Sequence, residues 1–65
     1  LTIEGEILDV GGNLYLVREQ DGGLVVLHTD NNTQGTETVS RGDQIEAKVS
    51  DANNLTLVLS IRQLK

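Results

Sequence analysis

Apolar residues in this chain alternate with polar ones over short runs, and turns rich in glycine and asparagine separate the runs. A period of two residues places successive side chains on opposite faces of an extended strand. The residue types in the breaks accept tight-turn geometry, including the left-handed backbone. No segment carries a convincing helical period. The pattern therefore predicts an all-β fold.

The first three predicted strands form a meander, in which "GGN" at 11–13 and "QDGG" at 20–23 supply the turns. A long polar stretch, "HTDNNTQGTET", then leads toward a fourth strand, and "DANN" turns that strand into the fifth. The predicted strands are 2–10, 14–19, 24–29, 44–50 and 55–64. On the last of them we expect one apolar face, formed by Leu55, Leu57, Leu59 and Ile61.

The first strand changes the parity of its apolar residues part of the way along. Ile3 and Ile7 share a face across Gly5, whereas Leu8 and Val10 lie on the other face. A change of parity beside a strand glycine predicts a bulge or a sharp bend, which lets one strand pair with both halves of a closed sheet. Three meander strands, a crossing connection and two further strands are the order of an OB-fold, a five-stranded Greek-key barrel. We expect residues 1–65 to form one such OB-like domain.

The length of 65 residues allows only a small core, and the chain has no cysteine for a disulfide or a thiolate metal site. Closing the sheet into a barrel would limit its exposed edges. No apolar run approaches the roughly 18 residues that span a bilayer, so we expect no membrane span. Because the chain begins with Leu1 rather than methionine, we expect a processed form or an excised domain.

The net charge of −5 disfavours nucleic-acid binding. Affinity for a phosphate backbone comes from clustered Lys and Arg, and bases stack on aromatic side chains. The basic residues here are scattered, and Tyr15 is the one aromatic residue. The basic residues are Arg18, Arg41, Lys48, Arg62 and Lys65. The acidity indicates a solubility device.

Catalytic groups are scarce in this sequence. A nucleophile needs a base within hydrogen-bonding reach, and His28 is the one conventional candidate. Glu4 and Glu6 share a strand face and could in principle do acid–base work, but no apolar pocket residues surround them in the sequence. We therefore expect no enzyme and no cofactor. His28 itself is expected on the surface, because zinc normally takes three or four protein ligands.

The stretch from Asp30 to Thr38 partly matches an EF-hand calcium loop. Oxygen-bearing side chains fall at several ligand positions, and Gly35 takes the turn position. However, Arg41 stands where the bidentate glutamate belongs, and the flanks are predicted strands rather than helices. We expect no metal site and a polar connection whose side chains cap turns. The alternative is a weak calcium site formed by Asp30, Asn32, Gln34 and Glu37. The tripeptide "RGD" at 41–43 is likewise interpreted as a turn before a strand.

The second and third strands are apolar on both faces. If the barrel core takes Tyr15, Val17, Val25 and Leu27, the residues between them must point outward. A strand with one wet face should be polar at those positions, and apolar patches usually mark contact surfaces. The outward residues are Leu14, Leu16, Leu24 and Val26.

The layout "IEGEILDVGGNLYLVREQDGG", "LVVLHTDNNT" and "RGDQIEAKV" resembles small bacterial OB-fold proteins and domains, many of them exported and poorly characterised. The motifs that carry the resemblance are Tyr15 with Val17, Asp21 with Gly22, and Gly42 with Asp43. It implies binding or scaffolding rather than catalysis, in a periplasmic or extracellular setting. In such relatives we would expect charged residues at several outward positions of the third strand, where this chain has Leu24 and Val26.

The sequence thus predicts a non-enzymatic module that acts by protein contact or self-assembly through the outward apolar residues of strands two and three. The alternative is a ligand-binding OB-fold, for an oligonucleotide, an oligosaccharide or weakly bound calcium at residues 30–38. The segment "GDQIEAKV" also resembles small molybdate-binding OB-like domains, but the chain has no Ser- or Lys-rich anion site and its net charge disfavours an oxyanion.

Overall fold

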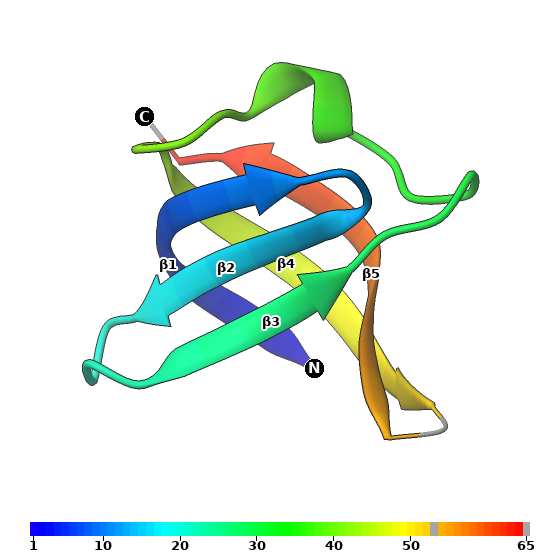
Figure 1. Cartoon of the computed structure of the whole chain (residues 1–65), viewed down its shortest axis with the longest axis horizontal. Helices are drawn as coiled ribbons and strands as arrows, with labels where there is room; N and C mark the ends of the chain where they lie inside the picture. The colour runs from blue at the N-terminus through cyan, green and yellow to red at the C-terminus, as the bar shows by residue number, and fades with distance from the viewer. Residues whose placement is uncertain (53, 65) are drawn as a thin grey trace.

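The computed structural model describes residues 1–52 and 54–64, with only the backbone described at residue 52. Five strands close into a barrel with the neighbour order β1-β2-β3-β5-β4 (Figure 1). The strands are β1 (Thr2–Gly11), β2 (Leu14–Glu19), β3 (Leu24–His28), β4 (Gln44–Ala52) and β5 (Leu55–Gln63). The predicted all-β, OB-like barrel is confirmed, and each strand lies within two residues of its predicted ends. A short 3₁₀ turn, η1 (Thr36–Thr38), was not predicted.

β1 pairs with two neighbours, as its change of parity predicts. Its first half, from Thr2 to Glu6, is antiparallel to β4, and its second half, from Gly5 to Gly11, is antiparallel to β2. The two ladders overlap at Gly5 and Glu6, and a Cβ atom on Gly5 would collide with the Arg18 carbonyl oxygen. The register shift falls beyond Gly5, at Leu8, between Ile7 and Asp9. Gly5 therefore allows the close approach of two strands, and the bulge at Leu8 places Val10 opposite Tyr15.

The barrel interior is filled by aliphatic side chains from all five strands and by one tyrosine from β2. Tyr15, Val17 and Leu27 are buried and Val25 packs against the core, so the predicted inward set of β2 and β3 is confirmed. β4 alternates as its sequence pattern indicates. The buried residues are Ile7, Tyr15, Val17, Leu27, Ile45, Ala47, Val49, Val58 and Ile61.

The prediction that Leu55, Leu57, Leu59 and Ile61 form one face of the last strand is wrong. Val58 and Ile61 are buried, whereas Leu55 and Leu59 are 46% and 51% exposed. The ladder between β4 and β5 pairs Lys48 with Ser60 and Val49 with Val58, so Leu59 is left over as a bulge. An extra residue reverses the parity of everything beyond it. Strict alternation along the sequence could not show that reversal.

The weakest seam of the barrel lies between β3 and β5. These parallel strands share one paired position among the described residues, His28 with Leu57. Beyond it Gln34 continues the seam: its N–H donates to the Leu59 carbonyl (3.1 Å) and its carbonyl accepts from the Ile61 N–H (2.9 Å). The connection between β3 and β4 is thus part of the sheet closure. No helix in the described part of the chain is long and apolar enough to cross a membrane.

Replacing Gly5 with alanine tests the two-sided pairing of β1. The added Cβ collides with backbone, which cannot move without separating β1 from β2. We expect Gly5→Ala to lower the free energy of unfolding by about 1–3 kcal/mol in urea denaturation. Gly11→Ala, in the same strand, meets nothing within 4 Å and is the matched control, expected within about 0.5 kcal/mol of wild type. Equal effects of the two substitutions would contradict the close approach at Gly5.

Candidate binding surface

Four outward aliphatic residues of β2 and β3 lie on neighbouring positions of one ladder. Leu16 is paired directly with Val26, while Leu14 is paired with His28 and Leu24 with Arg18. Side chains opposite each other across an antiparallel ladder are in contact distance, and diagonal neighbours are within reach of long side chains. The ladder therefore brings together the four predicted contact residues. They are called the apolar face below: Leu14, Leu16, Leu24 and Val26.

The apolar face is open to solvent at most of its positions. Leu24 is 63% exposed, Val26 45% and Leu14 40%, while Leu16 is half-buried. A shallow hollow of about 260 Å³ lies over the β1 side of the face, lined by Asp9, Gly11, Leu14, Leu16 and Val26. The face is thus a nearly continuous apolar surface with one depression in it. Such a surface, when rimmed by polar groups, is typical of a contact site.

Charged side chains border the apolar face toward β1. Asp9 is paired with Leu16 across the β1–β2 ladder. Arg18, which is opposite Leu24, donates to the Glu6 carboxylate at 3.0 Å. This ion pair is exposed and contributes little stability. Its placement beside Leu24 gives the apolar face a polar margin.

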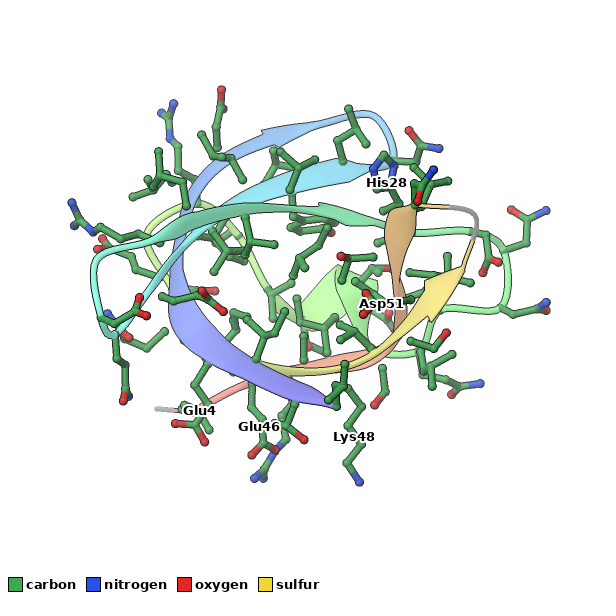
Figure 2. All side chains as sticks on the ribbon, turned by 90° about the horizontal axis from the view of Figure 1, so that it is seen from below. Glu4, His28, Glu46, Lys48 and Asp51 are labelled. Atoms are coloured by element: carbon green, nitrogen blue, oxygen red, sulfur yellow. The ribbon has the colours of Figure 1, made fainter. Side chains whose placement is uncertain are left out.

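His28 lies at the other end of the apolar face. Its side chain is half-buried (Figure 2), and the ladders pair it with Leu14 of β2 and Leu57 of β5. Both neighbours on the outer surface are aliphatic, so the ring is placed for packing rather than for coordination. Among the described residues, no three His, Cys, Asp or Glu side chains gather in a group that could hold a metal ion.

The Asp30 carboxylate is engaged by its own loop. Its Oδ1 accepts from the Asn32 N–H at 2.8 Å and from the Thr33 hydroxyl at 3.4 Å. The Thr33 hydroxyl also lies 2.7 Å from the Val58 carbonyl, which ties the turn to β5. This is the local capping expected of a connection.

The residues of the calcium alternative face different parts of the surface. Asp30 lines a hollow of about 380 Å³ with Gly12, Asn13, Thr29 and Asn31. Gln34 and Glu37 line another hollow, of about 530 Å³, on the β4–β5 side. The loop geometry therefore disperses the predicted oxygen ligands and favours the interpretation as a connection.

The larger hollow was missed by sequence reasoning, because it forms where loop residues 34–37 meet β4 and β5, and no local pattern shows that contact. Its polar walls include Glu37, Glu46, Lys48 and Arg62, and Arg62 Nε donates to the Glu46 carboxylate at 2.8 Å. Figure 2 shows Glu46 and Lys48 projecting outward from the barrel beside Glu4. Glu4 is opposite Glu46 in the ladder and accepts from Gln20 at 3.4 Å. Within this hollow the Glu46 carboxylate is thus paired with the Arg62 guanidinium.

The "RGD" segment is a structural turn. The Asp43 carboxylate accepts from the Ser40 N–H at 2.8 Å, and Gly42 has a positive φ of 95°. The Gly42 N–H donates to the Ile7 carbonyl at 2.8 Å, and the Ile7 N–H donates to the Asp43 carbonyl at 3.0 Å. These bonds hold the turn against β1, in agreement with its interpretation from the sequence.

No family model matches the chain, and no curated protein matches its sequence. Solved structures do resemble its fold. A silver form, Ag(I)CusF, has a TM-score of 0.84 at 11% identity, covering 97% of this chain and 95% of its own. Apo-CusF from Escherichia coli has a TM-score of 0.88 at 11% identity, covering 100% and 87%. A silver complex of the E. coli protein has a TM-score of 0.87 at 11% identity, covering 100% and 91%. At this identity the likeness shows that the chain shares their small barrel fold.

The donor set of this chain does not fit a soft ion such as Ag(I). Soft monovalent ions are selected by thioether and thiolate sulfur. The chain contains no Met and no Cys, and His28 is its one imidazole. The barrel of the silver-binding neighbours is therefore present here without the sulfur ligands that such ions prefer.

Removal of the Asp30 carboxylate distinguishes a turn cap from a metal ligand. We expect Asp30→Ala to lower the free energy of unfolding by about 1 kcal/mol, because the Asn32 N–H loses its acceptor while the Thr33 hydroxyl keeps the Val58 carbonyl. Glu37→Gln, which alters the other carboxylate of the alternative site, is the control and should leave stability unchanged. Millimolar calcium should not shift the thermal midpoint of wild type or of either variant. A calcium-dependent rise in wild type that Asp30→Ala abolishes would instead identify a metal site.

Proposed function

We propose that this chain is a non-enzymatic binding barrel that contacts another polypeptide through the apolar face. The observation that carries the proposal is the exposure of Leu14, Leu24 and Val26 on adjacent strands, in a chain whose core is already filled by other residues. Covering each such side chain would contribute roughly 1.5 kcal/mol or more. A domain of this size gains a large part of its total stability from a few contacts of that kind.

The residues around the apolar face support contact rather than chemistry. His28, the one conventional base, is flanked by Leu14 and Leu57 on the outer surface. The carboxylates nearest the face are Asp9, which accepts from the Val10 N–H at 2.9 Å, and Glu6, which is paired with Arg18. Neither arrangement provides a nucleophile with an adjacent base. The resemblance stated from the sequence also supports a periplasmic or extracellular setting, which we include in the proposal.

A second candidate function is binding of a small ligand, and the silver in the neighbouring structures favours this class. Two features of this chain weigh against particular ligands. The chain offers soft metal ions no sulfur donor. It offers an oligonucleotide no aromatic stacking surface, because its one aromatic residue, Tyr15, is buried. Calcium and oligosaccharides would have to use the exposed polar loop of residues 30–38.

Substitution of Leu24 and Val26 tests the lead proposal. An apolar face that contacts protein should also cause weak self-association at high concentration. We expect the light-scattering mass of wild type to rise between micromolar and millimolar protein. The double variant Leu24→Lys/Val26→Lys should stay monomeric and folded, because lysines on an exposed surface prevent burial. Leu59→Lys, on the comparably exposed bulge of β5, is the control and should behave as wild type. Loss of the fold in the double variant would show that these are core residues and would defeat the proposal.

Amide chemical shifts separate the two candidate functions. Ag(I), calcium, a short oligonucleotide and a short oligosaccharide are each titrated into isotope-labelled protein. We expect no saturable shifts at β2, β3 or residues 30–38, because the donors and stacking groups these ligands need are absent or engaged. A saturable response to any one of them in these segments would make ligand binding the function.

A further inference from the structure

The backbone of β3 points half of its hydrogen-bonding groups away from β2. The Glu19 N–H donates to the Gly23 carbonyl at 2.8 Å, and the Thr29 N–H donates to the Asn13 carbonyl at 2.9 Å. These two bonds lie at opposite ends of the β2–β3 ladder. In an antiparallel ladder, hydrogen-bonded pairs alternate with non-hydrogen-bonded pairs. The bonds at the two ends therefore determine which residues in between are bonded across the ladder.

The alternation assigns the same hydrogen-bonded pairs whether it is followed from the Glu19–Gly23 end or from the Thr29–Asn13 end of the ladder. Val25 and Leu27 exchange hydrogen bonds with β2, through their partners Val17 and Tyr15. The N–H and C=O groups of Leu24, Val26 and His28 consequently point to the opposite side, toward β5. The same three residues turn their side chains to the outside of the barrel.

Among the described residues, β5 pairs with this edge at one position. His28 is paired with Leu57, and no other β3–β5 pair occurs within the described residues. Figure 1 shows β3 and β5 diverging from that point toward the beginning of β3. Leu24 and Val26 therefore present exposed apolar side chains together with backbone groups that β5 does not pair. Exposed edges in natural sheets usually carry Lys, Pro or a bulge that blocks pairing, and residues 24–28 carry none of these.

We infer that the open edge of β3 accepts an extended segment of another protein, which adds to the barrel as a further strand. This inference rests on the proposed function and specifies how the contact is made. In strand addition, main-chain hydrogen bonds supply affinity, and alternate side chains of the incoming segment pack on the receiving sheet. Here they would pack beside Leu24 and Val26 of the apolar face.

The charge at the open end of β3 specifies the partner's chemistry. Asp21 precedes the strand in the β2–β3 turn and is exposed, whereas Asp30 lies beyond the position where β5 pairs with His28. A segment with β-branched residues in its middle and a lysine or arginine at the end that reaches Asp21 complements this arrangement. A second copy of the chain does not, because its own β3 is preceded by Asp21 and followed by Asp30 rather than by a lysine or arginine. The net charge of −5 opposes that pairing as well.

Hydrogen exchange on the wild-type barrel tests whether the edge is open. In the free protein, the amides of Leu24 and Val26 should exchange at least roughly tenfold faster than those of Val25 and Leu27, which are bonded to β2. Equal protection of all four amides would mean that the edge is closed and that the inference is wrong. This readout needs no substitution and does not depend on a partner.

A designed peptide tests the addition itself. The probe is the blocked heptapeptide Lys-Thr-Val-Thr-Val-Thr-Lys, and the readout is the amide spectrum of labelled protein. We expect saturable shifts centred on Leu24 and Val26 and slower exchange of their amides in the complex. Replacing both terminal lysines of the peptide with glutamate should weaken binding at least roughly tenfold at low salt. Absence of binding by the lysine peptide, or equal binding of both peptides, would overturn the inference.

Two substitutions at one position separate the backbone from the side chain. Val26→Pro removes the N–H that points to the open edge, and proline is tolerated where that N–H faces solvent. It should weaken peptide binding at least roughly tenfold, whereas Val26→Thr, which keeps the N–H and a branched side chain, should weaken it less than about threefold. Circular dichroism checks the fold of both variants. If Val26→Pro does not fold, the wild-type exchange and peptide measurements still decide the question.

Further outcomes distinguish this inference from the proposed function. If Leu16→Lys abolishes peptide binding and Val26→Pro does not, the apolar face makes the contact without strand pairing. The inference is then wrong and the proposed function stands. If Val26→Pro instead abolishes self-association of the barrel alone, the occupant of the edge is a second copy, which also overturns the inference.

Discussion

The double pairing of β1 is the constraint on which the rest of the barrel depends. In this sheet of five short strands β1 pairs with both β2 and β4, and the two ladders overlap at Gly5 and Glu6. Close approach at Gly5 excludes any Cβ atom, and the bulge at Leu8 places Val10 opposite Tyr15 of β2. Once β1 is shared in this way, β2 and β3 form one wall of the barrel. Their second face remains on the outside, and that face becomes the candidate contact surface.

The seam between β3 and β5 is only partly closed by the two strands, and the polar connection between β3 and β4 completes one end of it. β3 and β5 meet at His28 and Leu57, and Gln34 extends the seam beyond that point through backbone bonds. The side chains of Asp30 and Thr33 hold the loop in the shape that delivers Gln34 to β5. The loop thus closes one end of the seam and leaves the beginning of β3 open. The polarity that suggested a metal site is accounted for by turn capping.

Most of the fold follows from the sequence because alternation and turn residues act locally. The inward set of β2 and the alternation of Ile45, Ala47 and Val49 follow from a period of two. The bulge at Leu59 does not, because it depends on how β5 registers with β4 across the barrel. For the same reason the hollow between η1 and the β4–β5 strands was not foreseen. The apolar face was predictable. When apolar residues run without a break along two strands, every second one fills the core and the others must lie on the outer surface.

The chain shares the fold of silver-binding barrels, but it contains no sulfur donor. A small barrel of this kind presents an outer wall on β2 and β3 whatever side chains occupy it, so the fold places no demand on what the wall binds. In this chain the wall carries Leu14, Leu16, Leu24 and Val26, which offer no lone pairs to a metal ion. Aliphatic side chains gain free energy only when another surface removes them from water. Beside them, the backbone of Leu24 and Val26 favours a partner that is itself polypeptide.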